Sequence, residues 1–360
     1  MHDNFTTYKK EEYKTLIKMD SLPIFTNKTY STYEDAISCK TGSVNLVQSL
    51  ISGFIYNLDF EPDQMNYDNT YNNEQGFSNA FLKHLDLVSK IIFKEVSTSS
   101  KIIEIGCGKG LFLNKLKKDG FQIKGYDPTY EGDDVNIIKD YFSEKYNTDA
   151  DFLILRHTLE HIKDPFTFLH LIAKANNYLG KIYIEVPTFD WISDRTAFWD
   201  ITYEHCNYFT ETTLSSMFNE SKTGRLFGYQ YIYLIADLSS LKQEIQVQEI
   251  QEFDMKKFKD KINQYQIKID KLISIAIWGG AAKGLLFLNQ IDPYAKKIEY
   301  VIDINPAKHN RFIAKSGHKI LLPIILNSHP VINIFVANEN YYDEIKESLN
   351  HFNINLIKIQ

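Results

Sequence analysis

Short apolar runs that end in a glycine turn or an acidic residue recur through the middle of the chain, and helical spacing follows them. Strands that alternate with helices in this way are typical of a parallel sheet covered by helices. The predicted strands of this unit are residues 102–105, 122–126, 135–139, 151–155 and 181–186. We therefore predict an α/β, Rossmann-like core whose ligand site lies at the carboxyl ends of the strands.

A second pattern of this kind predicts a smaller Rossmann-like unit near the end of the chain. Before it, apolar residues recur at alternating spacings of three and four from Met255 to Leu272. This spacing predicts a helix packed on a neighbouring domain, because the run is too short for the heptads of a coiled coil. The predicted strands of the second unit are residues 275–278, 300–303, 331–337 and 356–359.

The first part of the chain is aromatic and irregular, with turn signals at Pro23, Gly42, Gly53 and Pro62 and a loop pattern over 63–76. We expect a small irregular N-terminal domain there. The predicted domains are an N-terminal domain at 1–80, a core at 81–240, a linker helix at 241–273 and a C-terminal domain at 274–360.

Composition narrows the possible classes of protein. The chain has 360 residues, of which 44% are hydrophobic, enough for two or three globular domains. A net charge of −6 and a pI near 6.0 argue against a nucleic-acid partner. No apolar run has the length of a membrane span, and residues 1–4 lack a signal-peptide pattern. Three scattered cysteines form no disulfide framework. We therefore expect a cytoplasmic protein without membrane contact, and its oligomeric state stays open.

A glycine-rich turn follows the first predicted strand of the core. That strand carries Glu104 and runs into Gly106, Gly108 and Gly110. Glycine is needed where a ligand lies against bare backbone between a strand and a helix. A dinucleotide fingerprint would need its third glycine at the position of Leu111. The spacing Glu-x-Gly-x-Gly-x-Gly resembles instead the nucleotide loop of S-adenosylmethionine (SAM) methyltransferases.

Further polar residues follow the next strands of the core. Asp127 ends the second strand, where one carboxylate can accept hydrogen bonds from both ribose hydroxyls. Asp140 follows the third strand, in place to meet the adenine amino group, and Arg156 follows the fourth. We therefore predict SAM as the cofactor, with these three residues and the glycine turn in its site. A nucleotide-binding domain of another kind is the alternative.

Several segments together resemble one family, the three-part sugar C-methyltransferases that act on nucleotide-linked 4-keto-deoxysugars. The resemblance covers nearly the whole chain. It implies a zinc-binding N-terminal domain, a SAM-binding core and a Rossmann-like C-terminal domain. The segments that carry it are residues 75–78, 104–110, 126–128, 156–161, 198–205, 208–209 and 278–284.

The N-terminal region departs from the pattern of this family. Ser49 and Ser52 stand at the two ligand positions of what looks like a Cys-x-x-Cys-Gly knuckle, and no cysteine precedes Cys39. A neutral hydroxyl does not replace a thiolate at a structural zinc site. We therefore expect no zinc in this domain, and no other metal.

The best candidate for acid–base chemistry is His205, which follows Tyr203 and Glu204 in an aromatic setting. Methylation of carbon requires the removal of a proton beside a ketone, and imidazole titrates in a useful range. The resemblance implies His205 as the base, supported by Glu204 and Tyr203, and the alternative is a structural pair in a turn. His157 is a second candidate that faces the reacting centre.

Residues 157–161 also spell His-x-x-Glu-His, an inverted zinc-protease motif. They follow a strand of the SAM-type core, which is not the context that such a motif requires. We expect Glu160 and His161 to form hydrogen bonds at the start of a helix.

Substrate contacts are predicted in two places. Trp199 and Tyr208 are expected to contribute to the core and to a wall on which a sugar stacks. In the C-terminal unit, Gly279 and Gly280 could hold a phosphate at a helix N-terminus, with Lys283 as a point charge. A degenerate fold without a ligand is equally open there.

These observations predict a SAM-dependent methyltransferase of carbohydrate biosynthesis that methylates a nucleotide-linked sugar at a carbon beside a keto group. Methylation of a sugar hydroxyl is an alternative, because it needs a base too. A catalytically inactive binding protein of the same fold is the alternative outside enzymes. Intact Glu104, Asp127, Asp140 and His205 speak against it.

Overall fold

The middle of the chain forms a seven-stranded sheet in the order β11-β12-β9-β8-β5-β6-β7. This computed structural model describes residues 12–65, 71, 74–245 and 250–360. The first five strands in sequence are parallel, and β12 runs antiparallel between β9 and β11. The strands are β5 (Lys101–Ile105), β6 (Gln122–Tyr126), β7 (Ile137–Ile138), β8 (Phe152–Arg156), β9 (Lys181–Pro187), β11 (Lys222–Leu226) and β12 (Tyr231–Asp237).

Helices cover this sheet because each of them buries an apolar stripe. In α2, Phe81, Leu85, Val88 and Ile92 are spaced by four, three and four residues and are all buried. The Ser78 hydroxyl accepts a hydrogen bond from the Phe81 amide and so begins the helix. The helices of the core are α2 (Asn79–Phe93), α3 (Leu111–Lys118), α4 (Pro165–Ala175), α5 (Phe189–Arg195) and α6 (Glu211–Ser215).

The N-terminal region contains an antiparallel sheet, although its sequence appeared irregular. Its order is β1-β3-β4-β10, and the last strand comes from the core. Register shifts between Thr15 and Ile17 and between Met19 and Leu22 interrupt the alternation that would reveal a strand. The predicted loop at 63–76 lies partly outside the described residues. The elements are β1 (Tyr13–Pro23), β2 (Thr29–Tyr30), α1 (Tyr33–Ile37), β3 (Thr41–Ser49), β4 (Ile55–Asn57) and β10 (Asn207–Tyr208).

The C-terminal unit is a five-stranded parallel sheet in the order β16-β14-β13-β17-β18. The helix predicted between the two α/β units is confirmed as α7, which buries Phe258, Tyr265 and Ile269. The elements are α7 (Lys256–Asp270), β13 (Ile275–Trp278), α8 (Ala282–Ile291), β14 (Ile298–Ile302), β15 (Phe312–Ile313), β16 (Ile320–Leu321), β17 (Asn333–Val336), α9 (Tyr342–Ser348) and β18 (Asn355–Lys358).

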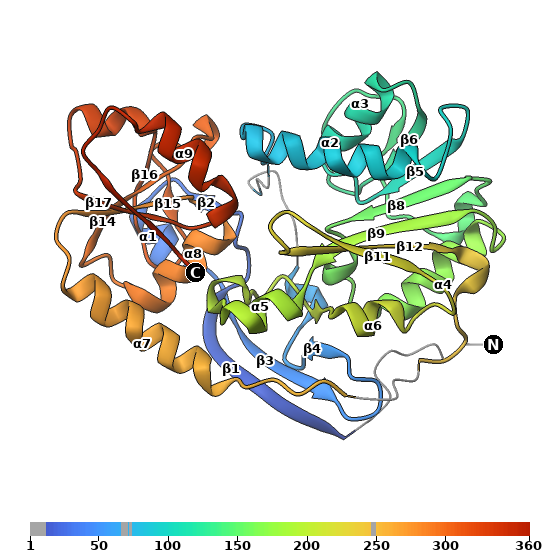
Figure 1. Ribbon diagram of the computed structural model, residues 1–360, viewed down its shortest axis with the longest axis horizontal. Coiled ribbons are helices and arrows are strands. Elements are labelled where there is room, and N and C mark those ends of the chain that lie inside the picture. Colours follow the sequence, from blue (N-terminus) through green and yellow to red (C-terminus); the bar gives the residue numbers. More distant parts are fainter. Residues whose placement is uncertain (1–11, 66–70, 72–73, 246–249) are drawn as a thin grey trace.

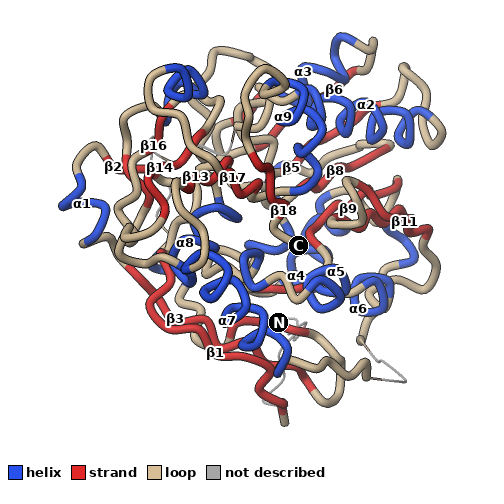
Figure 2. Tube along the Cα trace, turned by 60° about the vertical axis from the view of Figure 1, so that its left-hand side comes forward, coloured by secondary structure: helices blue, strands red, loops and turns tan. Residues whose placement is uncertain are grey.

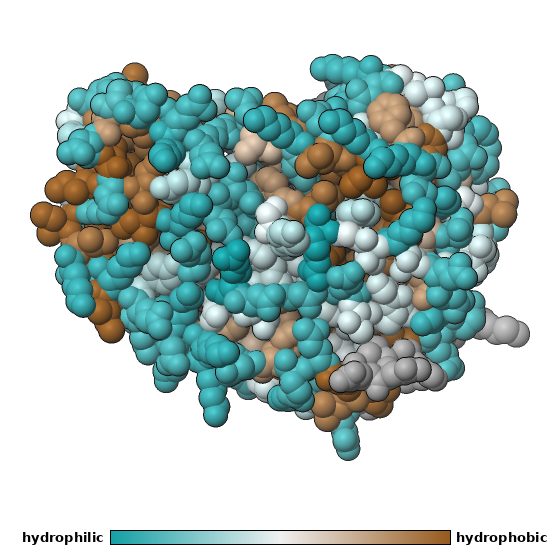
Figure 3. Space-filling view, viewed as in Figure 1, coloured by the Kyte–Doolittle hydropathy of each residue, from teal (hydrophilic) through white to brown (hydrophobic). Residues whose placement is uncertain are grey.

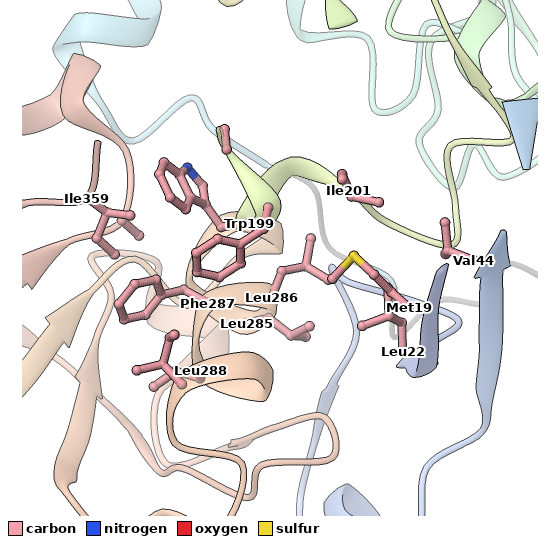
Figure 4. Packing of buried hydrophobic residues seen from close by; sticks show 14 of the residues in the cluster. Met19, Leu22, Val44, Trp199, Ile201, Leu285, Leu286, Phe287, Leu288 and Ile359 are labelled. Carbon is pink, nitrogen blue, oxygen red and sulfur yellow. The ribbon is translucent and has the colours of Figure 1, made fainter. Parts of the chain in front are cut away.

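The three units form one assembly, with the core and the C-terminal unit side by side above the N-terminal sheet (Figure 1). One hydrophobic cluster joins them, and Figure 4 shows Leu22, Trp199 and Phe287 within it. Helices α7 and α8 pack against each other, as the turned view in Figure 2 shows. Strand β2 pairs with β15, which ties the N-terminal and C-terminal units together.

The face seen in Figure 1 is largely hydrophilic, and apolar side chains gather mainly over the C-terminal unit (Figure 3). Within the described ranges, no helix combines the length and the hydropathy that a membrane span requires.

Candidate active site

Two tethers hold His205 beside the segment that follows β8. The Cys206 thiol donates to the Glu160 carbonyl at 3.4 Å, and the Asn207 side-chain amide donates to the Ile162 carbonyl at 2.6 Å. Strand β10 then pairs with β4, which fixes the chain just after His205. The His205 ring lies 4.9 Å from the ring of His161, nearly perpendicular to it.

His205 lines a cavity of about 290 Å³ to which all three units contribute residues. This cavity is mostly apolar but carries a group of titratable side chains on its core wall, namely His157, Glu160, His161, Glu204 and His205. Another part of its wall belongs to the C-terminal unit and includes residues 278–279, 281–284 and 303–305. A mostly apolar cavity with a few converging polar groups is the usual form of a small-molecule site.

The two residues before His205 point toward the N-terminal unit. The Glu204 carboxylate accepts hydrogen bonds from the Thr26 hydroxyl at 3.0 Å and from the Tyr71 hydroxyl at 2.8 Å, and from the Thr26 amide. The Tyr203 hydroxyl accepts from the Glu61 amide at 3.0 Å, and Tyr203 is only 1% exposed. Glu204 therefore links the cavity wall to the N-terminal unit, and Tyr203 does not reach the cavity.

Trp199 and Tyr208 belong to the core and not to a sugar-stacking wall. Trp199 is 1% exposed and packs edge-on against Phe198 and Tyr265. The Tyr208 hydroxyl donates to the Thr202 carbonyl at 2.8 Å and accepts from the Thr202 amide. The prediction of substrate contacts for this pair is corrected, because neither side chain lines the cavity.

His157 stands between two carboxylates. Its Nδ1 lies 3.5 Å from Glu160 and its Nε2 lies 3.3 Å from Glu185. Burial alone would lower the pKa of His157, but the interactions with these two carboxylates raise it to about 9. The residue has a φ of +50°, which is costly for a residue with a side chain and persists only when its surroundings fix it. His157 thus presents a fixed cation to the cavity at neutral pH.

Glu185 on β9 was not predicted as part of the site. It is fully buried, where its carboxylate accepts from Tyr183 at 2.6 Å and contacts His84 at 2.8 Å. Arg156 pairs with the same carboxylate at 3.3 Å. A Glu within a run of apolar residues on a central strand is the sequence signal that could have revealed it, since such a buried charge needs partners.

The surroundings of His205 have the opposite effect on its charge. Burial and the neighbouring His161 lower the pKa of His205 to about 3, against the attraction of Glu160. His205 is therefore a neutral imidazole at physiological pH, which is the form that accepts a proton.

Two groups of side chains in the described part of the chain bring metal-type ligand atoms within 4.8 Å of one another. In the first, Glu185 already accepts hydrogen bonds from Tyr183 and His84, which account for its place. The second contains Glu160, His161 and His205, and this group belongs to the cavity wall. Both groups lie in the core, and the N-terminal serines belong to neither.

The glycine turn after β5 fits the methionine end of SAM. A Cβ on Gly106 would lie 2.2 Å from the Thr158 hydroxyl, whereas one on Gly108 would meet no atom within 4 Å. The backbone at Gly108 therefore borders open space. Within the described residues, Oε2 of the buried Glu104 has no hydrogen-bond partner. An orphaned carboxylate oxygen beside an open glycine turn suits the cationic amino group of SAM.

The two acidic residues predicted for the nucleoside part differ in their surroundings. The Asp127 carboxylate accepts from the Gly108 amide at 2.7 Å and from the Thr129 amide at 2.8 Å, so it stands directly at the glycine turn. Asp140 is bound by Lys145 and by the Tyr146 hydroxyl at 2.6 Å. Arg156 forms an ion pair with Glu185, and its guanidinium packs over the Phe112 ring at 4.5 Å. Its effect on the site therefore comes from its ion pair with this buried carboxylate.

In the C-terminal unit, the glycine turn borders the cavity at the start of α8. The N-terminus of this helix has no side-chain cap, and Gly279 and Gly280 precede it. The Gly280 amide donates to Asp303 at 2.8 Å. Lys283, predicted as the point charge, forms a partly buried ion pair with Asp200 of the core. The uncapped amides are the remaining feature suited to an anion.

The serines of the knuckle-like turn form a local hydrogen-bonded turn. The Ser49 hydroxyl accepts from the Ile51 amide at 3.2 Å and from the Ser52 amide at 3.0 Å. Ser49 and Ser52 are both buried. The Ser49 hydroxyl therefore pairs these two backbone amides of the turn.

Two family models match the chain, and they do so in successive parts. Residues 77–221 match a methyltransferase domain, and residues 236–355 match a C-methyltransferase C-terminal domain. No curated protein matches the chain.

Solved structures resemble the core in shape. A SAM-dependent methyltransferase from Archaeoglobus fulgidus is 19% identical over 44% of this chain and 99% of its own, with a TM-score of 0.34. One from Methanosarcina mazei is 16% identical over 40% and 94%, with a TM-score of 0.32. The 1,6-didemethyltoxoflavin-N1-methyltransferase of Burkholderia thailandensis, with S-adenosylhomocysteine bound, is 13% identical over 45% and 79%, with a TM-score of 0.33.

The strand order, the glycine turn and the first family match define a class I methyltransferase core with SAM as its cofactor. The second family match makes the assignment more specific. The chain is a SAM-dependent methyltransferase that carries a C-methyltransferase C-terminal domain.

Proposed function

We propose that this enzyme methylates a nucleotide-linked sugar at the carbon beside a keto group, with His205 as the general base. The observation that carries the proposal is the cavity that extends from His205 in the core to the uncapped start of α8 in the C-terminal unit. A nucleotide sugar has a reactive ring at one end and phosphates at the other, which matches a base on one wall and free amides on the other.

The side chains of the core wall account for the proposed chemistry. SAM, when bound, supplies an electrophilic methyl group. The neutral imidazole of His205 would accept the proton from the carbon beside the ketone, which would leave that carbon free to take the methyl group as its bond to the sulfur of SAM breaks. The cation of His157 stabilises the negative charge that develops on the ketone oxygen. A neutral base and a cationic neighbour in one cavity are the arrangement that enolate chemistry requires.

Methylation of a sugar hydroxyl is the alternative reaction, since the same imidazole could accept a hydroxyl proton. The match to a C-methyltransferase C-terminal domain supports carbon as the acceptor. We also propose a cytoplasmic location, because Cys39, Cys107 and Cys206 are free thiols, as a reducing compartment keeps them.

Turnover with 4-keto nucleotide sugars tests the proposal. His205→Ala should lower kcat by about 10²–10⁴-fold, the usual contribution of a general base, with little change in SAM affinity. His351→Ala, at an exposed position outside the cavity, is the matched control. Full activity of His205→Ala would refute the base assignment.

Solvent exchange separates the two reactions. In deuterium oxide without SAM, the wild-type enzyme should exchange the acceptor proton beside the ketone, and His205→Ala should not. A product methylated at oxygen, with no exchange at carbon, would establish the alternative reaction.

A further inference from the structure

The Glu204 carboxylate, which is next to His205 in sequence, is not placed to balance the charge of the His205 ring. Glu204 precedes the base directly, but its oxygens accept hydrogen bonds from Thr26 and Tyr71 of the N-terminal unit. A carboxylate bound in this way is oriented toward that unit. The base therefore needs another anion, because accepting a proton in a buried site creates a cation.

Glu160 meets the requirements for that anion. It is 2% exposed, lines the same cavity and has a ligand oxygen within 4.8 Å of the ring nitrogens of His161 and His205. Its Oε1 faces His157, whereas its Oε2 has no hydrogen-bond partner among the residues that the structure describes. A buried oxygen without a partner is costly, and a role in the reaction is one explanation for its retention.

The backbone around Glu160 fixes this arrangement. Glu160 and His161 lie on a single helical turn at Leu159–His161, and the Cys206 thiol donates to the Glu160 carbonyl. His161 Nδ1 contacts the Glu204 carbonyl at 2.9 Å. These two contacts, together with the hydrogen bond from Asn207 to the Ile162 carbonyl, join the segment that carries Glu160 to the segment that carries His205.

We propose that Glu160 is the positioning carboxylate of His205, and that it stabilises the imidazolium formed when His205 accepts the acceptor proton. This inference rests on the proposed function. The proton would move from the acceptor carbon to the imidazole. The electron pair left on carbon would form the new bond to the methyl group as the bond from that methyl group to the sulfonium sulfur of SAM breaks, so that SAM would leave as the neutral thioether. The imidazolium then faces Glu160, which stays ionised throughout and takes no proton.

The charges around both groups agree with this assignment. Burial alone would raise the pKa of Glu160, but the hydrogen bond from His157 and the charge of His161 bring it below its ordinary value, so Glu160 is an anion at neutral pH. The charged groups that act on the pKa of His205 are His161, Glu160, His157 and Lys283, and Glu160 is the anion among them.

Steady-state kinetics of Glu160→Gln and Glu204→Gln test the inference. Glu160→Gln should lower kcat by about 10²-fold with less than about threefold change in acceptor KM, because an opposite charge near 5 Å in a partly buried site has an effect of that order. The acidic limb of its kcat–pH profile should move to lower pH, because the imidazolium has lost its anion. Glu204→Gln should instead raise the acceptor KM and lower the melting temperature. It should leave the acidic limb of the kcat–pH profile at its wild-type position.

Glu160→Asp provides the conservative test, since it keeps the charge. It should keep the acidic limb near its wild-type position, and it also gives a measurement if Glu160→Gln does not fold. A wild-type kcat and limb in Glu160→Gln, or a displaced limb in Glu160→Asp alone, would overturn the inference. If His205→Ala is inactive in that case, the base assignment stands and only the role of Glu160 fails.

Discussion

The ionisation state of the buried Glu104 carboxyl affects both the stability of the fold and the binding of SAM. This residue is buried on β5, and burial raises the pKa of its carboxyl from 4.5 to about 8, although the charge of Arg156 opposes the shift. A group whose pKa is higher in the folded state stabilises the fold below its unfolded pKa and loses that contribution as the pH rises through the folded value. The wild-type protein should therefore lose stability between pH 4.5 and pH 8.

The size of this effect follows from the two pKa values. Each pKa unit corresponds to about 1.4 kcal/mol, so ionisation of Glu104 costs on the order of 5 kcal/mol above pH 8. Glu104→Gln has no proton to lose. Its free energy of unfolding relative to the wild type should be near zero at pH 4 and should rise by several kcal/mol toward pH 9.

Guanidinium unfolding at a series of pH values measures that difference. Glu131→Gln, at an exposed position, is the matched control and should follow the wild type. Saturating SAM should flatten the wild-type curve, because its amino group gives the ionised carboxylate a cationic partner. Parallel curves for Glu104→Gln and the wild type without SAM would refute the reasoning.

Three further predictions concern the other sites. Asp127→Ala should weaken SAM binding by about 1.5–3 kcal/mol in calorimetry, since a carboxylate that accepts charge-assisted hydrogen bonds is lost. Unchanged affinity would exclude Asp127 from the ribose site. Asp200→Asn should release Lys283 from its partly buried ion pair and strengthen binding of a nucleoside diphosphate several-fold. Unchanged binding would show that Lys283 does not meet phosphate. Elemental analysis should find no zinc bound in the N-terminal domain, because Ser49 offers no thiolate. One zinc per chain that is lost on changing Cys39 would contradict this.

The core could be predicted from the sequence because its signals are local. The strand that carries Glu104 ends in a glycine turn, and the next strand ends in Asp127, which the structure brings to the same turn. Parallel strands put their carboxyl ends at one edge of a sheet, so residues far apart in sequence meet there by topology alone.

The N-terminal sheet could not be predicted in the same way. Bulges in β1 break the alternation of apolar and polar residues, and buried polar residues such as Asn45 and Gln48 lie in β3. Its last strand, β10, comes from residues 207–208, some 150 positions further along the chain. A sheet completed by a distant strand leaves no periodic signal in the segment that contains most of it.

The division of roles between Glu204 and Glu160 shows why a catalytic pair is harder to predict than a cofactor loop. Adjacency in sequence favoured Glu204, yet its carboxylate binds Thr26 of another unit. Glu160 lies 45 positions before His205 and reaches it through the tether between Cys206 and the Glu160 carbonyl. The two carboxylates have the same chemistry, so tertiary contacts alone decide which of them faces the base. Kinetics of the two glutamine variants therefore test the fold as well as the mechanism.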